Sequence, residues 1–201
     1  ETLIREVIEE MDVKGKIVIA TKAGNDFYNT SKEDDAGYGP IRQNMDYDYI
    51  ISAAEKSLKR LNVESLDILQ LHSPDTEKLQ RDEPWRALEK LKQDGKIKHA
   101  GWSVQSFGET SQAFLLDEHR DLLDVIQVRY NLLEREAEEV LFKKSQQYGI
   151  GVIVRIPLLF GFLTGKFNKN ARFDREDHRS MNLSPDKLEK YLRQLEQMQP
   201  L

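Results

Sequence analysis

The sequence predicts an α/β fold built on a parallel sheet, and two observations support this prediction. First, short apolar runs rich in β-branched residues recur along the 201 residues, each followed by a turn and a longer segment of helical periodicity. Second, the runs are apolar almost throughout, which is typical of parallel strands that helices cover. Strands that alternate with helices in this way define the α/β class.

Five of the apolar runs are predicted as strands. Each is short enough for a strand and is bounded by turn-forming or charged residues. In chain order the predicted strands are Lys16–Lys22, Asp67–His72, Lys98–Val104, Asp124–Val128 and Ile150–Ile156.

The segments between and around these runs carry helix signals. Apolar residues fall on one face at helical spacing, proline stands in the first turn, and glycine follows the last turn. Ser184 is an expected N-cap for the last helix, because its hydroxyl can accept from a free backbone amide. The predicted helices are Leu3–Met11, Tyr49–Leu61, Pro84–Gly95, Glu136–Tyr148 and Pro185–Met198.

Two longer segments interrupt the alternation, namely Gly24–Asp48 and Phe167–Leu183. Each follows a predicted strand, so in a parallel sheet both lie at the carboxyl ends of the strands, where ligands bind. Loops of this length are usually functional or mobile. The alternative for each segment is a solvated insertion without a role.

Composition excludes several functional classes. The chain has no cysteine, which rules out disulfides, thiolate metal sites and a cysteine nucleophile, and we expect no metal site. Its 30 Lys and Arg residues are mixed with 35 Asp and Glu residues, giving a net charge of −5, which argues against nucleic acid as a partner. No apolar stretch approaches the ~20 residues of a membrane span. We therefore expect a cytoplasmic protein with no membrane or nucleic-acid partner.

Two ionisable residues end otherwise apolar strands: Lys22 and His72. At the carboxyl ends of adjacent strands they would share the active face of a barrel. The alternative is ordinary packing, since a strand-end lysine often extends to water. If the pair is functional, Lys22 could form a Schiff base with a carbonyl, or the pair could polarise a carbonyl oxygen and tune a nearby acid. The spacing alone does not choose between these chemistries.

Several motifs in order resemble the aldo-keto reductase family, and the match runs from Glu1 to about residue 180. They are SLKRL, LQLHSPD, ALEKLKQDGKIKHAGWS and VRIPLLFGFLTGK. The resemblance implies a (β/α)8 TIM barrel, of which this chain would hold about strands three to seven, so that residues 1–201 form a single incomplete barrel domain. It also implies an oxidoreductase that reduces aldehydes and ketones with NADPH, with a small carbonyl compound as substrate.

The resemblance assigns catalytic roles to two residues. The family's catalytic tetrad is Asp, Tyr, Lys and His, in which the tyrosine is the general acid. Lys22 in the ATK motif and His72 in the LH-x-P motif match the tetrad lysine and histidine, whereas the Asp and Tyr would precede Glu1. Tyr28 and Tyr38 are interpreted as loop residues that do not replace the missing acid.

The resemblance also assigns cofactor contacts. Ser103 and Gln127 match the residues that hydrogen-bond the nicotinamide carboxamide, and both side chains can donate and accept. The loop after the family's seventh strand, which holds the pyrophosphate, matches the segment from Pro157 to Lys166. Its candidate contacts, with Arg179 as a further phosphate or adenosine contact, are Pro157, Leu158, Gly161, Leu163, Lys166 and Arg179. NADPH is expected from family habit, and NADH is not excluded.

Two departures from the family pattern keep other functions open. Val104 stands in place of an asparagine donor, and Arg155 stands where many members stack an aromatic ring on the nicotinamide. A guanidinium can also stack on a ring, so Arg155 stays a cofactor candidate. The alternatives are a nucleotide-binding sensor or regulatory subunit without turnover, and a Schiff-base lyase that uses Lys22. Trp102 and the two long loops are expected to line the substrate pocket.

Overall fold

The computed structural model describes residues 1–27 and 42–198. Its centre is one sheet of five parallel strands in the order β1-β2-β3-β4-β5. The predicted α/β class and the parallel sheet are thereby confirmed. The strands are β1 (Ala20–Ala23), β2 (Leu66–His72), β3 (Ile97–Ser103), β4 (Leu123–Arg129) and β5 (Gly151–Arg155).

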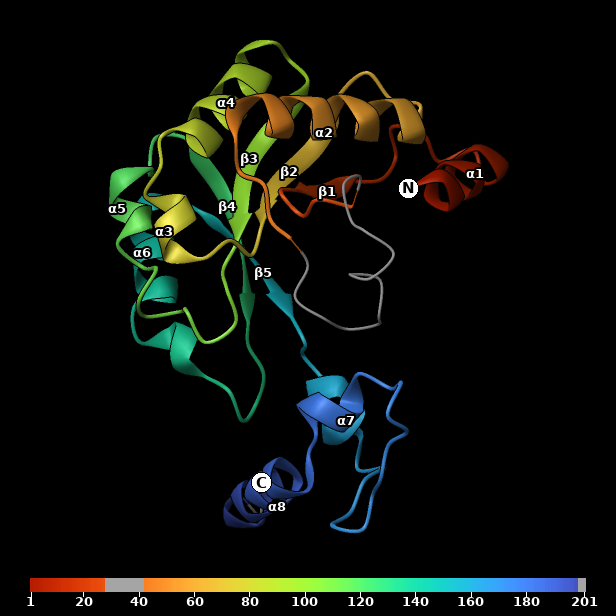
Figure 1. Ribbon diagram of the computed structural model, residues 1–201, viewed down its shortest axis with the longest axis vertical. Helices are drawn as coiled ribbons and strands as arrows, with labels where there is room; N and C mark the ends of the chain where they lie inside the picture. Colours follow the sequence, from red (N-terminus) through yellow and green to blue (C-terminus); the bar gives the residue numbers. More distant parts are fainter. Residues whose placement is uncertain (28–41, 199–201) are drawn as a thin grey trace.

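The helices that connect the strands lie on one face of the sheet, as Figure 1 shows. Because sequential parallel strands are neighbours, the chain crosses back over this face between each pair of strands. The helical elements are α1 (Thr2–Glu10), α2 (Tyr47–Leu61), α3 (Thr76–Leu79), α4 (Glu83–Gln93), α5 (Leu115–Glu118), η1 (Glu136–Glu138), α6 (Leu141–Tyr148), η2 (Leu159–Thr164), α7 (Arg179–Asn182) and α8 (Pro185–Gln197).

Helix ends follow the sequence signals. Gly149 ends α6 in the left-handed region at φ 69°, and Pro185 opens α8 directly after Ser184, although the Ser184 side chain makes no capping hydrogen bond. Glu136–Tyr148 was expected as one helix, which is wrong. The structure breaks it at Val140, whose φ of −131° is not helical, so that η1 and α6 are separate.

The first strand is shorter than its apolar run predicts. The expected strand Lys16–Lys22 begins only at Ala20, and Ile17 and Val18 are exposed. The reason lies in Asp67, whose carboxylate accepts from the amide of Ile19 at 2.8 Å. A side chain therefore takes the amide donor of Ile19. The Ile19 carbonyl still accepts from the amide of Ile68 at 3.1 Å, and residue pairing between β1 and β2 begins at Ala20.

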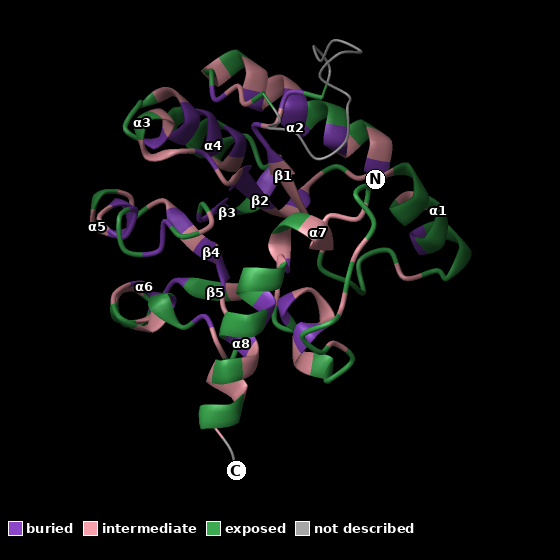
Figure 2. Ribbon diagram, turned by 60° about the horizontal axis from the view of Figure 1, so that its bottom comes forward, coloured by how far each residue is buried: buried purple, intermediate pink, exposed green. Residues whose placement is uncertain are grey.

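Most of the core lies between the sheet and its helices. Leu69, Leu71 and Ile126 of the strands pack with Trp85 and Leu88 of α4, all of them buried. The view coloured by burial shows the helices with buried inner sides and exposed outer sides (Figure 2). Trp102 also belongs to this core, so the expectation that it lines the substrate pocket is wrong. It alternates with Gly101 and Ser103 along β3 and faces the helices.

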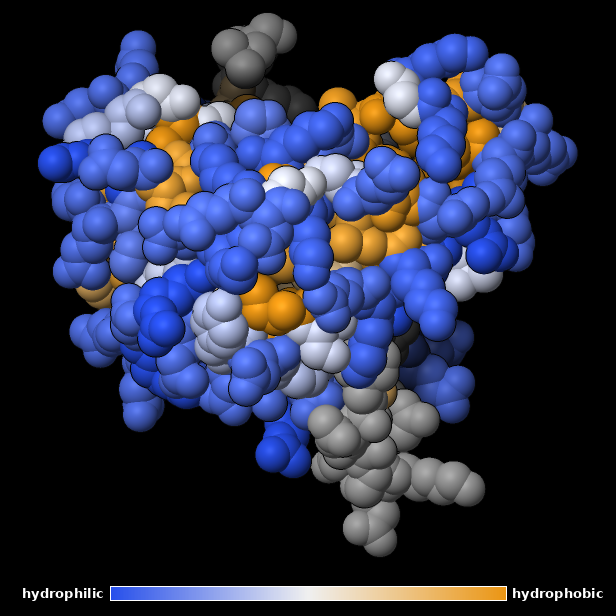
Figure 3. Space-filling view, turned by 90° about the horizontal axis from the view of Figure 1, so that it is seen from above, coloured by the Kyte–Doolittle hydropathy of each residue, from blue (hydrophilic) through white to orange (hydrophobic). Residues whose placement is uncertain are grey.

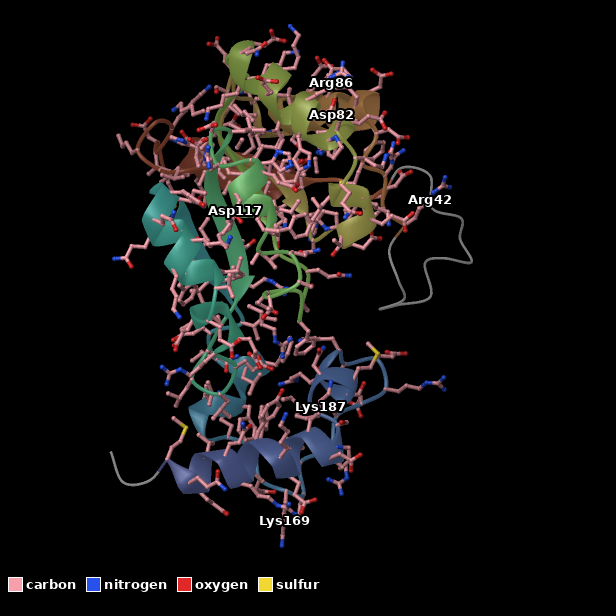
Figure 4. The ribbon with its side chains drawn as sticks, turned by 90° about the vertical axis from the view of Figure 1, so that its left-hand side faces the viewer. Arg42, Asp82, Arg86, Asp117, Lys169 and Lys187 are labelled. Carbon is pink, nitrogen blue, oxygen red and sulfur yellow. The ribbon has the colours of Figure 1, made fainter. Side chains whose placement is uncertain are left out.

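A second, smaller core lies beyond the carboxyl end of β5. Buried residues of η2 pack against α8, and the cluster consists of Leu159, Phe162, Leu183, Leu188 and Tyr191. Lys169 and Lys187 mark this part of the molecule in Figure 4, at the end opposite to Asp82 and Arg86 of the α4 region. The segment after β5 is therefore packed on its own helix rather than on the main sheet.

The face of the molecule shown in Figure 3 is mostly hydrophilic, with hydrophobic residues visible between the hydrophilic ones. None of the helices in residues 1–27 and 42–198 is long and apolar enough to cross a membrane.

Candidate active site

Strand register gathers the predicted polar residues on the face of the sheet that the helices leave open. His72 pairs with Ser103, and Ser103 pairs with Gln127, so these three residues form one row across β2, β3 and β4. Lys22 pairs with Gln70, two positions before His72 on the same strand. Because side chains alternate between faces along a strand, all of them project from the same face.

Lys22 and His72 share one cavity. It has a volume of about 420 Å³ and lies along β1, between α2 and the end of β2. The lining residues are Glu1, Ala20, Thr21, Lys22, Ala23, Asn25, Phe27, Ala53, Ser57, Arg60 and His72. The structure therefore brings together the two residues whose pairing the strand ends predicted.

Electrostatics at this cavity favour a neutral histidine. Burial, followed by the positive charges of Lys22 and Arg155, lowers the pKa of His72 to about 4. Burial and the charge of Arg155 also lower the pKa of Lys22 from its usual value. His72 is therefore an uncharged imidazole at neutral pH, able to donate one hydrogen bond and accept another.

The base of the Gly24–Asp48 segment is fixed above the end of β2. The side-chain amide of Gln43 donates to the carbonyls of His72 at 2.9 Å and Ser73 at 3.1 Å. Asn25 and Gln43 form an antiparallel bridge, and the Tyr49 hydroxyl donates to the Asn25 carbonyl at 2.9 Å. This segment therefore holds the backbone that carries His72. Tyr28 and Tyr38 lie outside the described residues.

Ser103 and Gln127 differ in whether their buried polar atoms have hydrogen-bond partners in the protein. The Ser103 hydroxyl lies 3.0 Å from the hydroxyl of Ser73 and is buried. The Gln127 Oε1 is buried without a hydrogen-bond partner among the described residues. A buried carbonyl oxygen without a donor is costly, so this atom suits a ligand that brings an N–H group, such as a carboxamide. Gln127 therefore fits the nicotinamide role that the resemblance assigns to it.

Arg155 ends β5 and turns towards the loop after β3. Its Nη2 donates to the Ser106 hydroxyl at 2.7 Å and to the Val104 carbonyl at 3.3 Å, while its Nε is buried without a partner among the described residues. Burial and the neighbouring charge of Arg129 lower its pKa. The side chain of Val104 is fully buried in the main core.

The segment Pro157–Lys166 contains η2 and has an unusual backbone. Leu159, Phe160 and Gly161 have φ values of 47°, 56° and 90°, all in the left-handed region. Gly161 adopts this conformation without strain, whereas the other two carry side chains and do so at a cost. Pro157, Leu158 and Lys166 are exposed, and Leu163 is half-buried. The candidate phosphate-binding residues therefore lie on one compact turn open to solvent.

Arg179 has a partner within its own loop. Its guanidinium forms hydrogen bonds with the Asp177 carboxylate at 2.5 to 3.0 Å and lies over the rings of Phe167 and Phe173. These contacts raise the pKa of Arg179 and lower that of Asp177 to about 2, in each case first through the hydrogen bonds between them. A phosphate contact by Arg179 stays a prediction, and it requires Arg179 to exchange this carboxylate for the ligand.

Sequence reasoning missed one group of residues beside this site. Arg129 and Glu134 form a buried ion pair at the end of β4, and Tyr191 of α8 donates to the same carboxylate. The only local signal was an arginine at a strand end with a glutamate five residues later. Nothing in the sequence pattern connects them with a tyrosine 57 residues further on.

The fold and these side chains define a class of protein: part of a (β/α)8 barrel with polar and ionisable residues at the carboxyl ends of its strands, where barrel enzymes bind their ligands. The model described as "Aldo/keto reductase family" matches residues 1–200. This chain belongs to the aldo/keto reductase family, and the family resemblance seen in the motifs is confirmed.

Individual relatives agree with this assignment. The L-glyceraldehyde 3-phosphate reductase of Escherichia coli (strain K12) is 32% identical over 181 residues, which are 87% of this chain and 49% of the relative. A Schizosaccharomyces pombe protein with the provisional name voltage-gated potassium channel subunit beta is 34% identical over 176 residues, 84% of this chain and 47% of the relative. The chain spans about half the length of the curated relatives it matches.

Solved structures show the same fold. The glycerol dehydrogenase AKR11B4 from Gluconobacter oxydans superposes with a TM-score of 0.75 at 30% identity, over 95% of this chain and 56% of that one. The holo form of the aldo-keto reductase AKR11C1 from Bacillus halodurans gives 0.69 at 25% identity, over 90% of this chain and 56% of that one.

Proposed function

We propose that this chain is the part of an NADPH-dependent carbonyl reductase that supplies the lysine and histidine of the catalytic site and most of the cofactor contacts. The observation that supports this most directly is the shared cavity of Lys22 and His72 at the carboxyl ends of adjacent strands. The substrate is a small aldehyde or ketone. The proposal treats residues 1–201 as a single incomplete barrel domain of a cytoplasmic protein and takes NADPH over NADH from family habit.

The chemistry divides between the cofactor and the residues of this chain. A bound nicotinamide would supply the hydride for the carbonyl carbon. His72, neutral at pH 7, donates an N–H to the carbonyl oxygen and so orients the substrate. Lys22 brings a half-buried positive charge that lowers the pKa of an acid beside it. The proton donor is assigned to a residue other than these two.

The proposed cofactor contacts come from the family resemblance, and the positions of these residues in the structure support them. Gln127 would accept a hydrogen bond from the carboxamide through the oxygen that lacks a partner, and Ser103 lies beside it in the row. Pro157, Leu158, Gly161, Leu163 and Lys166 would surround the pyrophosphate. Arg155 would lie against the nicotinamide, with its guanidinium plane held by Ser106 and Val104.

The test is NADPH oxidation with a small reactive aldehyde by the natural-length protein. Lys22→Met is expected to lower kcat by about 10²–10⁴-fold, the range for loss of a group that assists proton transfer. Lys143→Met, which removes an exposed lysine of α6, is the matched control and leaves kcat unchanged. Equal activity of Lys22→Met and the wild type would contradict the proposal. An adduct trapped on Lys22 by borohydride would instead support the Schiff-base lyase.

A second candidate is a nucleotide-binding sensor or regulatory subunit without turnover. It is favoured by Val104 and Arg155, which depart from the family's usual residues, and by the similarity to a protein named as a potassium channel subunit. This candidate predicts that NADPH binds, as measured by its fluorescence, while no aldehyde is reduced. Binding with turnover that depends on Lys22 would exclude it.

A further inference from the structure

A buried carboxylate, that of Glu134, is the centre of a hydrogen-bond network beside β4. It accepts from Arg129 Nε at 2.6 Å and Arg129 Nη2 at 2.5 Å, from Asn131 Nδ2 at 2.7 Å and from the Tyr191 hydroxyl at 2.9 Å. All four residues are at most 7% exposed. Four donors on one carboxylate satisfy it fully, which is the condition under which a buried charge is tolerated.

The contacts of this network converge on the segment Pro157–Lys166. Asn131 Nδ2 also lies 3.3 Å from the carbonyl of Ile156, the residue before that segment. The Arg129 guanidinium lies 5.5 Å from the centre of the Phe160 ring, inside the segment. Tyr191 packs its ring against Phe162, with the ring centres 5.6 Å apart. The network therefore holds the start, the middle and the packed side of the same turn.

This segment needs such support. Ile156, Leu159 and Phe160 all have positive φ values, of 61°, 47° and 56°, and none of them is glycine. Left-handed residues with side chains cost energy and persist only where their surroundings hold them. The sheet does not hold them, because β5 ends at Arg155. The side chains around Glu134 instead contact the turn and hold its conformation.

Glu134 and Arg129 both stay ionised at neutral pH. Burial opposes ionisation of Glu134, but the hydrogen bonds from Arg129, Asn131 and Tyr191 outweigh it and hold the pKa of Glu134 below its usual value. For Arg129, burial is likewise outweighed by Glu134, and its pKa is raised. Burial, with the bond to Glu134, raises the pKa of Tyr191 to about 12. The hydrogen bonds of the network therefore do not change with pH in the neutral range, and the network is not a pH switch.

We propose that Arg129 and Glu134 are positioning residues that hold Pro157–Lys166 in its nucleotide-binding shape before a nucleotide arrives. This inference rests on the proposed function, since that function assigns the segment to the pyrophosphate. A turn that is ordered beforehand loses little conformational entropy on binding, and this raises affinity without a new contact to the ligand. Neither residue touches the reacting atoms.

The test compares Glu134→Gln with Glu138→Gln in the natural-length protein. Glu138 is the matched control, because it lies in η1, four residues away, and its ion pair with Arg135 is more exposed. Two readouts are taken: hydrogen exchange of the amides from Leu158 to Gly165 without nucleotide, and the Kd for NADPH together with kcat at saturating NADPH.

Glu134→Gln is expected to speed exchange in this segment and to raise the Kd about tenfold, the usual weight of a hydrogen bond to a charged group. Exchange in β2 and β3, and kcat at saturating NADPH, stay unchanged. Tyr191→Phe removes one of the four donors, keeps the ion pair, and gives a smaller effect in the same direction should Glu134→Gln not fold. The control resembles the wild type in every readout.

Two results would overturn the inference. One is unchanged exchange in the segment in both Glu134→Gln and Tyr191→Phe, and the other is faster exchange that extends equally through β2 and β3. The first would show that the turn holds itself, and the second that the network is only a part of global stability. A wild-type protein that binds no NADPH would overturn the proposed function instead, and the exchange data would still report whether the network holds the turn.

Discussion

The two ends of the sheet position their polar side chains by different means. At the β1–β2 end, Lys22 and His72 owe their places to strand register, and their pKa values are lowered mainly by burial. At the β4–β5 end, Arg129 and Arg155 are held by specific hydrogen bonds, and the turn that follows rests on a second core. The first arrangement is rigid because the sheet is rigid, whereas the second depends on individual side-chain contacts.

This difference predicts how each end of the sheet responds to substitutions in the core beside it. Changes in the main core are transmitted to the sheet as a whole, because its strands share one packed cluster. Changes in the second core affect the segment after β5, because few of its contacts reach the sheet. Four experiments separate the two behaviours.

The largest effect is expected from cavities in the two cores. Leu69→Ala removes a fully buried side chain of β2 and should lower the free energy of unfolding by about 2–5 kcal/mol, the usual cost of such a cavity. Leu188→Ala makes the same change in α8 and should speed hydrogen exchange mainly in residues 156–197. Urea unfolding followed by circular dichroism, together with hydrogen exchange, measures both. Equal loss of protection in β2 from both variants would show that the two cores unfold as one.

A smaller loss of stability is expected at Gly101 in the centre of the sheet. A Cβ here would lie 2.5 Å from the Val125 carbonyl oxygen, and because that atom is backbone, the strands themselves must shift. Gly101→Ala should therefore cost about 1–3 kcal/mol of unfolding free energy. Gly151→Ala is the matched control, since its nearest atom lies at 3.4 Å. A thermal melt in which the two variants coincide would contradict this account of β3 and β4.

Gln127 should affect binding and not stability. Gln127→Met removes an oxygen that has no partner in the described protein, so the melting temperature should not fall. If that oxygen accepts from the nicotinamide carboxamide, the Kd for NADPH rises about fivefold, as for one neutral hydrogen bond. Gln70→Met is the control and leaves the Kd unchanged, because Gln70 lies on β2, which β3 separates from β4, and precedes the row of His72 by two positions. An unchanged Kd in Gln127→Met would remove Gln127 from the cofactor site.

The last effect, which is confined to acidic pH, is the pH dependence caused by His72. Its pKa is about 4 in the folded protein, below the 6.5 of an exposed histidine, so the unfolded chain binds more protons between these values. His72 therefore does not reduce the free energy of unfolding above pH 6.5, and it lowers this free energy progressively as the pH drops towards 4. Unfolding at a series of pH values should show a shallower slope in this window for His72→Gln than for the wild type. Identical slopes would mean that His72 is not shielded from protonation.

The part of the site that lies on the strands, with Lys22 and His72, could be predicted from the sequence, because the identity and position of strands follow from local patterns. Apolar runs located β2 to β5, and the ionisable residues that follow apolar runs marked Lys22 in β1 and His72 at the end of β2. Where a side chain competed with the ladder, as Asp67 does at Ile19, the local pattern was insufficient. The apolar run alone does not show that a carboxylate 48 residues away takes the amide.

The other half could not be predicted, because it depends on contacts between distant residues. The left-handed turn at Leu159 and Phe160 has no local signal, since neither residue favours positive φ. Tyr191 reaches Glu134 only because α8 folds back onto η2. Trp102 was misplaced for a related reason: a large aromatic beside a predicted site residue was assigned to the pocket, although strand alternation turns it towards the helices.

The row of His72, Ser103 and Gln127 determines where this chain tolerates changes of length. One residue inserted into or deleted from β2, β3 or β4 would turn the remainder of that strand over and point its polar residue at the helices. Insertions in the connections that follow the row leave the register unaltered, and loop length costs little free energy. Variants that alter substrate choice through longer or shorter segments should therefore be sought after Ser73 and after Val104, or beyond the sheet within residues 167–178, and never within the paired strands.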